Sequence, residues 1–383
     1  MNNHSFSLFG FDQVMNYNNS MKKRLAFFAN DLRIGGIENA LVNLLNMIDY
    51  HKYDVTLFLE RKTGELLKQV NENVDVREYR IISEGNVLIR KFRNFFNRLK
   101  WSLSNRNKYD FSCAYVPYSF MACKLAKICS SNSSIYVHTD YTLIYENKDF
   151  HDFFDKRDIN GFRKVFFVSA NARDAFLKEY TNLAGKTIVC NNFVDYETIR
   201  KKAEVPIPDE KEKDVLLVFV GRLEDDSKKV GRLLETVKYL KSYKINAEAW
   251  IIGDGPDRDM YEKYVTDNEL SDIVSFKGMQ SNPYPYMKKA DYIVLTSDYE
   301  GYPVVYLESL CLGKKLITTI DVNDEMIFIP DNYGYIVSKD VNKMKEQVRD
   351  IMLNDNLDYQ DVDMADLNRR KMSILEIVFN GED

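Results

Sequence analysis

The chain has 383 residues, of which 45% are hydrophobic and 29% charged, and its formal net charge is -5. This length exceeds what one ordinary core needs, so we expect two folded domains. The negative charge argues against a general nucleic-acid binder, although a local patch can still be basic. The four histidines have no ligand-like spacing, so a structural zinc site is not expected.

The first twenty residues, 1–20, are rich in asparagine and lack a cationic start followed by an apolar stretch. We therefore expect a frayed or disordered extension and not a secretion signal. No later run is apolar for long enough to predict a transmembrane helix. The cysteines form no C-x-x-C pair and are typical of reduced, mostly buried thiols in a cytosolic protein: Cys113, Cys123, Cys129, Cys190 and Cys311.

In the first half of the chain, short apolar runs alternate with longer amphipathic segments. This alternation predicts parallel strands joined by crossover helices. Residues 21–203 are therefore predicted to form a doubly wound α/β domain. Its buried-strand candidates are 24–29, 54–59, 111–116, 134–137 and 164–169.

A polar stretch with two prolines, "RKKAEVPIPDEKEKD" at 200–214, predicts a linker. The alternation then restarts, so residues 204–365 are predicted to form a second Rossmann-like domain. Residues 366–383 contain an amphipathic helix that can pack on either domain. Ligands of such sheets bind beyond the carboxyl ends of the strands, so two facing domains predict a binding cleft. The strand candidates here are 215–221, 247–253, 273–276, 291–297 and 314–319.

The segment "DYEGYPVVYLESLCLG", residues 298–313, follows one of these strands. Pro303 suits the first turn of a helix, which is predicted to run to about Leu312 and to stop at Gly313. The unpaired N–H groups and the dipole at the start of this helix favour an anion, and Gly301 lets the backbone approach it.

Two carboxylates flank this predicted anion site, Glu300 in the loop and Glu308 within the helix. An acid, an anion hole and a second acid suit a nucleotide sugar, which has a hexose, a diphosphate and a ribose. The alternative is an ordinary turn residue and a solvated helix residue.

Other strand ends carry further candidates. Arg222 and Lys228 follow the strand at 215–221, and two such cations could hold a diphosphate without metal. Gly35 and Gly36 open a helix after the first strand, where backbone could approach a phosphate. His138 follows the strand at 134–137 and is predicted to face the same cleft.

With these pieces in order, residues from about 24 to 350 resemble the retaining nucleotide-sugar glycosyltransferases of the GT-B fold. The resemblance is to glycosyltransferase family 4, the glycosyl transferases group 1. It rests on eight segments that follow the family's order: "GGIEN", "VHTD", "VSANARDAF", "CNNFVDYETI", "VGRLEDDSKKVGRLL", "IIGDGPDRD", "KGMQSNPYPYMKKADYIVLTS" and "YEGYPVVYLESLCLG".

The resemblance implies a role for each matched residue. Arg222 and Lys228 match the cations that neutralise the departing diphosphate, and Glu308 matches the acid that holds the ribose hydroxyls. Glu300 matches the acid at the donor sugar, and His138 the histidine near the 6-position of that sugar. The resemblance also places glycines and helix-start residues against the donor: Gly35, Gly36, Gly221, Gly253, Gly301, Tyr302, Pro303 and Val304.

Three departures from the family pattern are visible. Lys229 follows Lys228 where the family often has Gly, and Tyr302-Pro303 stands where it often has Phe-Gly. The C-terminal region is short, so the helix that crosses back to the first domain is expected to be reduced.

The implied activity is hexosyl transfer with retention, from a nucleotide sugar that is most commonly UDP-linked in this family. No cofactor and no metal are expected. Two Asp-x-Asp strings, at 257–259 and 361–363, are interpreted as surface features. The implied acceptor is a glycan or a polyprenyl-linked oligosaccharide of bacterial surface polysaccharide synthesis. The implied location is the cytoplasm or the inner face of the cell membrane.

The segment "LIRKFRNFFNRLKWSL", residues 88–103, predicts a basic amphipathic helix. Such a helix can lie on an anionic membrane surface, and the alternative is that it packs on the first sheet. Its apolar positions fall on one stripe: Leu88, Phe92, Phe95, Phe96, Leu99 and Leu103.

Three other functions remain open at this point. A catalytically silent GT-B subunit that supports an active partner would often lack the cationic pair or the acids, which are present here. A GT-B sugar-nucleotide epimerase fits the "EGYPVVYLES" segment less well. A sugar-binding protein of two domains would normally be exported.

Overall fold

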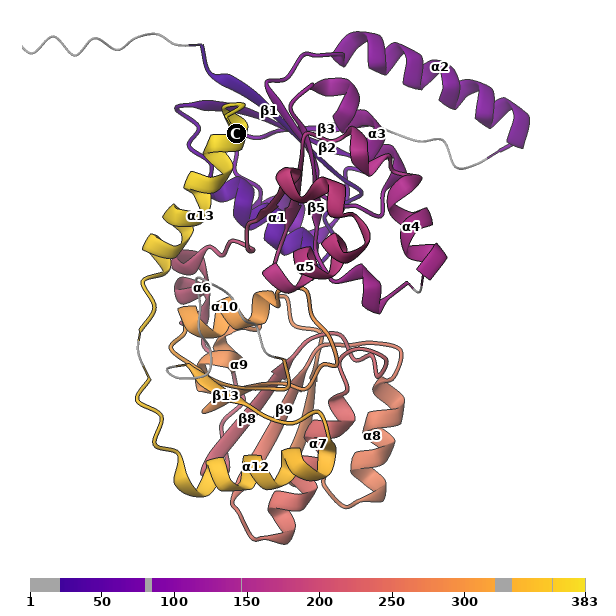
Figure 1. The fold of residues 1–383 in the computed structure, drawn as a ribbon. Coiled ribbons are helices and arrows are strands. Elements are labelled where there is room, and N and C mark those ends of the chain that lie inside the picture. The colour runs from indigo at the N-terminus through magenta and orange to yellow at the C-terminus, as the bar shows by residue number, and fades with distance from the viewer. Residues whose placement is uncertain (1–20, 80–84, 146, 321–332, 360, 383) are drawn as a thin grey trace, which may run out of the picture.

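The computed structural model describes residues 21–79, 85–145, 147–320, 333–359 and 361–382. The extension predicted at 1–20 lies outside the described residues. Two parallel sheets, each with helices on both faces, lie one above the other in Figure 1.

The first sheet has the strand order β3-β2-β1-β4-β5-β6-β7, and all its pairings are parallel. Its strands are β1 (Lys23–Ala29), β2 (Tyr53–Leu59), β3 (Asp75–Glu78), β4 (Phe111–Ala114), β5 (Ser133–Val137), β6 (Lys164–Phe167) and β7 (Thr187–Val189). The helices of this half are α1 (Gly36–Met47), α2 (Val87–Asn105), α3 (Phe120–Cys129), α4 (Asn147–Asp155), α5 (Ala170–Glu179) and α6 (Tyr196–Ala203). Short 3₁₀ helices join them, η1 (Glu65–Gln69), η2 (Tyr141–Leu143), η3 (Ile159–Gly161) and η4 (Thr181–Lys186).

The second sheet has the order β10-β9-β8-β11-β12-β13, again with parallel pairings. Its strands are β8 (Val215–Val220), β9 (Ala247–Ile252), β10 (Val274–Gly278), β11 (Tyr292–Leu295), β12 (Lys315–Thr318) and β13 (Gly334–Ile336). The accompanying helices are α7 (Val230–Ser242), α8 (Arg258–Asp267), α9 (Tyr284–Lys289), α10 (Val304–Cys311), α12 (Val341–Asn354) and α13 (Met364–Phe379). In each sheet the first strand is internal, and the next strands are added on one side of it before the rest are added on the other. Ligands of such sheets bind at the switch point where this order reverses.

All ten strand candidates are strands, with bounds that differ by at most two residues at either end. The prediction missed β3, β7 and β13, which are edge strands of their sheets. β3 has the sequence DVRE with no buried residue, so it lacks the apolar run that marks a central strand. The predicted linker starts too early, because α6 continues to Ala203 and the irregular connection begins only after it.

The last helix, α13, returns to the first sheet, beside β1 in Figure 1. Phe379 makes edge-type or tilted contacts with the rings of Phe27, Tyr53 and Phe111. The side chain of Asn132 donates a hydrogen bond of 2.7 Å to the carbonyl of Val378. The helix that was expected to be reduced therefore has 16 residues and closes the first sheet's core.

The two halves also touch directly through backbone. A Cβ on Gly301 would lie 1.8 Å from the carbonyl oxygen of His138, so only glycine fits there. Beside this contact, Asn192 donates a hydrogen bond of 2.9 Å to the carbonyl of Tyr302.

No helix in the described part of the chain combines the length and apolar character that crossing a membrane requires. All five cysteines are buried and free of disulfides, as predicted.

Candidate active site

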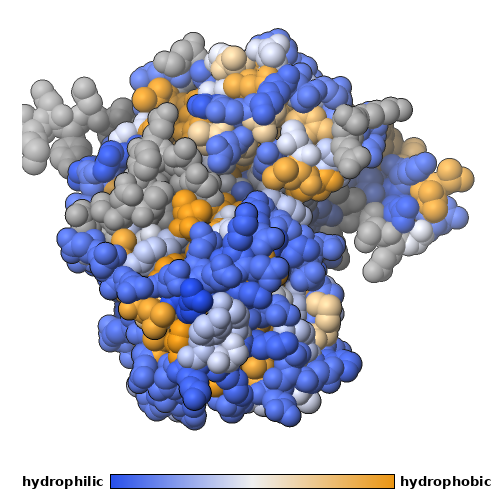
Figure 2. Space-filling model, turned by 60° about the horizontal axis from the view of Figure 1, so that its bottom comes forward, coloured by the Kyte–Doolittle hydropathy of each residue, from blue (hydrophilic) through white to orange (hydrophobic). Residues whose placement is uncertain are grey.

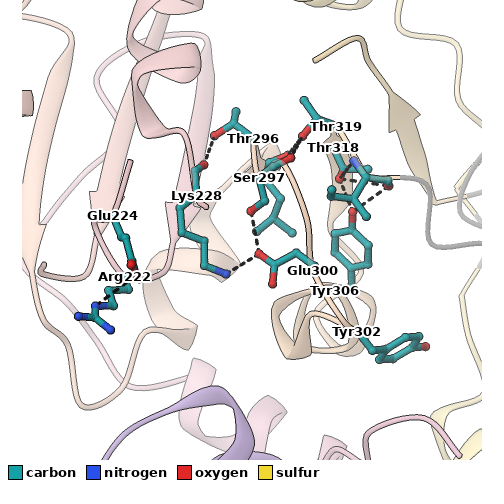
Figure 3. A network of polar contacts seen from close by, with 12 residues as sticks. Arg222, Glu224, Lys228, Thr296, Ser297, Glu300, Tyr302, Tyr306, Thr318 and Thr319 are labelled. Atoms are coloured by element: carbon teal, nitrogen blue, oxygen red, sulfur yellow. Dashed lines mark hydrogen bonds and ion pairs between the residues drawn. The ribbon is translucent and has the colours of Figure 1, made fainter. Parts of the chain in front are cut away.

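The centre of the site is an ion pair between Lys228 and Glu300, which come from different loops of the second sheet. Lys228 precedes α7, and its carbonyl accepts a hydrogen bond of 2.9 Å from Thr296. Glu300 follows β11, and the lysine ammonium and the Ser297 hydroxyl, at 2.7 Å, both donate to its Oε1. Figure 3 shows Lys228 and Glu300 pointing toward each other. The sequence named both residues but did not predict that they pair.

Arg222 lies at the same edge of the sheet but does not join this pair. Its Nε is 3.6 Å from the Glu224 carboxylate, and 67% of its side chain is exposed. In Figure 3 the guanidinium points away from Lys228. The structure thus holds one cation in place and leaves a second at the rim, where it can turn toward an anion.

Two of the glycines assigned to donor binding have a packing reason of their own. Gly253 has φ of +136°, and a Cβ there would lie 1.9 Å from the carbonyl oxygen of Gly221. The loops after β8 and β9 therefore approach each other through bare backbone, which a side chain would prevent.

The segment after Glu300 serves the contact between the two halves. Gly301 lies against the backbone of His138, and Tyr302 is buried, with its ring pointing away from Lys228 in Figure 3. Pro303 is the N-cap of α10 and Val304 is its first residue. The helix ends at Cys311, and Gly313 has φ of +64°, the left-handed stop that the sequence predicted.

Glu308 is buried within α10, so the solvated alternative is wrong for this residue. The hydroxyl of Tyr284 donates a hydrogen bond of 3.0 Å to its Oε1. Burial raises the pKa of Glu308 to about 7, and the bond from Tyr284 opposes that rise. A ligand that offers hydroxyl donors would favour the ionised form. Sequence reasoning missed Tyr284, although it lies in a quoted segment.

His138 is buried directly after β5, and its ring stacks on that of Tyr136. Its Nε2 lies 2.7 Å from the carbonyl of Tyr115, which makes Nε2 the protonated nitrogen. Burial lowers the pKa of His138 to about 4, so the ring is neutral at ordinary pH. Nδ1 is then an acceptor, and it has no partner in the described part of the chain.

Gly35 and Gly36 begin α1 at the facing edge of the first sheet. A Cβ on Gly35 would lie 2.3 Å from Oε2 of Glu38, whereas a Cβ on Gly36 would meet nothing within 4 Å. The space over Gly36 is therefore open. Tyr118 donates a hydrogen bond of 3.1 Å to Glu38, and burial raises the pKa of that carboxyl group. The sequence did not single out Glu38, although it stands in "GGIEN".

Among the described residues, no three His, Cys, Asp or Glu side chains gather as metal ligands would. The two Asp-x-Asp strings have structural uses. Asp257 accepts a hydrogen bond of 2.7 Å from the backbone N–H of Asp225, and Asp363 caps the start of α13.

Comparisons with known proteins agree with this architecture. Residues 200–365 match the family described as Glycosyl transferases group 1. The crystal structure of Anabaena Alr3699/HepE in complex with UDP has a TM-score of 0.70 at 14% identity, and the match covers 92% of this chain and 99% of that one.

Two curated relatives are similar in sequence. The first, from Campylobacter jejuni, is N-acetylgalactosamine-N,N'-diacetylbacillosaminyl-diphospho-undecaprenol 4-alpha-N-acetylgalactosaminyltransferase. It is 24% identical over 346 residues, which are 88% of this chain and 92% of that protein. The second, lipopolysaccharide 1,6-galactosyltransferase of Escherichia coli, is 28% identical over 141 residues, which are 36% of this chain and 38% of that protein.

The chain therefore has the GT-B fold, as predicted, with two Rossmann-like domains of parallel strands. Its second half carries a Glycosyl transferases group 1 domain.

Proposed function

We propose that this protein is a retaining glycosyltransferase of family 4, which moves a hexosyl unit from a nucleotide sugar to a glycan or polyprenyl-linked acceptor. The observation that carries the proposal is the Lys228–Glu300 pair at the edge of the second sheet, with the buried Glu308 further along α10. We propose a UDP-linked donor, because the similar HepE structure contains UDP.

The residues of the site could bind the three parts of such a donor, which are the ribose, the diphosphate and the sugar. Glu308 would accept hydrogen bonds from the ribose hydroxyls, and Glu300 from hydroxyls of the sugar. As the bond from the anomeric carbon to the diphosphate oxygen breaks, negative charge grows on the diphosphate. Lys228, and Arg222 after turning inward, would stabilise that charge. His138, held neutral, would accept a hydrogen bond from a sugar hydroxyl through Nδ1.

In the retaining reaction that we propose, the acceptor hydroxyl attacks from the face that the diphosphate leaves. Its proton passes to the departing phosphate oxygen, so the chain need not supply a general base. We propose that neither a metal ion nor a cofactor takes part. The named relatives act on undecaprenol-linked sugars or lipopolysaccharide, which supports a role in bacterial surface polysaccharide synthesis. The proposed location is the cytoplasm, at the inner face of the membrane.

A thermal-shift panel with UDP, GDP, ADP, CDP and their sugars, in the presence of EDTA, tests the donor site. A ligand that binds only the folded state raises the melting temperature, so UDP or a UDP-sugar should give a clear shift. Lys228→Ala and Glu308→Ala should each lower turnover by about 10²-fold or more while keeping the fold. Near wild-type turnover in either variant would reject the site assignment. No shift with any nucleotide would favour the silent-subunit alternative.

A further inference from the structure

The helix α2 exposes the apolar face that an ordinary surface helix buries. Its apolar stripe, residues Leu88, Phe92, Phe95, Phe96, Leu99 and Leu103, is between 46% and 76% exposed. A surface helix of a globular protein normally buries such a stripe. α2 projects from the first domain in Figure 1. In Figure 2 hydrophobic side chains, in orange, lie on the projecting part at the right, where Figure 1 places the start of α2. The helix does pack on the first domain through Trp101, as the alternative expected, but it leaves this stripe exposed.

The opposite face of α2 points inward and is mostly polar. It borders a cavity of about 390 Å³ between α2, α3 and β3, and the α2 side chains that line it include Asn94, Asn97, Ser104 and Asn105. Polar groups thus face the domain while phenylalanines face outward. Burial against the described residues does not explain the stripe, since the helix keeps its apolar side away from the core.

Specific contacts fix the rotation of the helix. Trp101 on the inward side packs edge-on against Phe58 at 5.3 Å and Phe28 at 6.0 Å, both in the core of the first domain. Asn86 caps the first turn by accepting hydrogen bonds from the N–H groups of Leu88 and Ile89. Turning the stripe inward would withdraw the indole from this core. The outward orientation is therefore built into the packing.

The charge of α2 favours an anionic partner. In a chain of net charge -5, this helix carries five basic residues and no acidic one: Arg90, Lys91, Arg93, Arg98 and Lys100. Lys91 and Arg93 are exposed, and the described residues offer them no ion pair, whereas Lys100 lines the cavity. Two copies of α2 packed together would bring like charges into one interface. An anionic surface would instead neutralise them.

We infer that the outward face of α2 binds an anionic lipid bilayer, with the stripe among the acyl chains and the exposed Lys91 and Arg93 at the headgroups. Phe92, Phe95 and Phe96 form one aromatic group, with ring centroids 4.6 and 5.6 Å apart along it. A helix with this division of apolar and basic residues lies in the plane of the membrane surface. The inference deepens the proposed function by naming the element that holds the enzyme where a lipid-linked acceptor resides.

Vesicle co-sedimentation of the full chain tests the inference. The wild type should pellet with vesicles of phosphatidylcholine and phosphatidylglycerol at low salt, and much less with phosphatidylcholine alone or at high salt. Phe92→Ser/Phe95→Ser/Phe96→Ser should weaken binding at least ~10-fold, because three exposed apolar anchors are lost. Lys91→Glu/Arg93→Glu should remove the preference for the anionic lipid. As a control for loss of exposed apolar surface elsewhere, Met260→Ser/Leu353→Ser on α8 and α12 should bind like the wild type.

Three results would overturn the inference: a wild type that stays in the supernatant, a triple phenylalanine variant that pellets normally, or a preference for neutral lipid. If the protein instead dimerises through the stripe and does not bind vesicles, the outward face of α2 is an interface with a second copy of the chain. The rise in melting temperature with UDP distinguishes this inference from the proposed function. All the α2 variants should still show that rise. If the wild type binds vesicles but shows no rise with UDP, the proposed function is rejected and the lipid-binding inference is kept.

Discussion

The fold buries the carboxyl group of Glu308. It lies on α10, buried, with one hydrogen bond from Tyr284. The sequence marks Glu308 because it follows the Gly-Tyr-Pro segment at 301–303 by a few residues. Its protonation could not be predicted, since Tyr284 and the surrounding burial come from another helix.

This burial predicts a pH dependence. The pKa of Glu308 in the folded chain, about 7, lies above its ordinary value of 4.5, so the folded state holds the proton more tightly than the unfolded state. The resulting stabilisation is complete below the unfolded pKa and is lost as the pH rises through about 7, by up to about 3 kcal/mol. Thermal denaturation should show this loss in the wild type between about pH 5 and pH 8.

Glu308→Gln is the matched variant, because glutamine keeps the shape and does not titrate. It should flatten this pH profile, and it should also flatten a rise in UDP affinity on the alkaline side, where the ionised carboxylate accepts ribose hydroxyls. An equally steep stability profile in Glu308→Gln would assign the titration to another group.

At the scale of elements, the inner strands of both sheets were predictable, whereas the edge strands β3, β7 and β13 were not. β8, with the sequence VLLVFV, is apolar throughout because helices cover both faces of the sheet. β3 is a charged strand at the edge of its sheet. It is a strand because it pairs with β2, and no local sequence pattern predicts it. The same limit holds for the site. Strand ends could be read one by one, but the meeting of Lys228 with Glu300 depends on two loops folding together.

α13 supports a prediction at this scale. Phe379→Ala removes a buried ring that three other rings contact, so it should destabilise the first domain by about 3–5 kcal/mol. Ile377 lies two positions away on the same helix and is 45% exposed, so Ile377→Ala should change stability by no more than about 0.5 kcal/mol. Urea denaturation followed by fluorescence compares the two. Equal effects would show that α13 does not complete the core.

At the scale of the whole molecule, one glycine governs how closely the halves approach. The loop at Gly301 rests on the backbone of His138, beside the hydrogen bond from Asn192 to Tyr302. Both loops carry proposed donor contacts, so the distance between the domains also sets the geometry of the site. The sequence predicted a cleft between two domains but not which residue touches across it.

Gly301→Ala should force these loops apart, because the new methyl group would meet backbone atoms that cannot turn aside. We expect a loss of about 1–3 kcal/mol, a weaker shift with UDP and a larger radius of gyration. Gly185→Ala is the matched control, since a Cβ there meets nothing within 4 Å. X-ray scattering and thermal shift on both variants make the comparison. An unchanged Gly301→Ala would mean that the halves do not rest on this contact in solution.

The return of α13 also fixes the order in which the protein can finish folding during synthesis. The face of the first sheet around Phe27 and Phe111 is covered by Phe379, which leaves the ribosome 176 residues after Ala203 at the end of α6. At about 5–20 residues per second, that face waits roughly 10–35 s for its cover. The second domain, by contrast, has its strands and α12 in one unbroken stretch before α13. The domain made first is therefore the one completed last, and during that interval its open aromatic face is the natural target for chaperones.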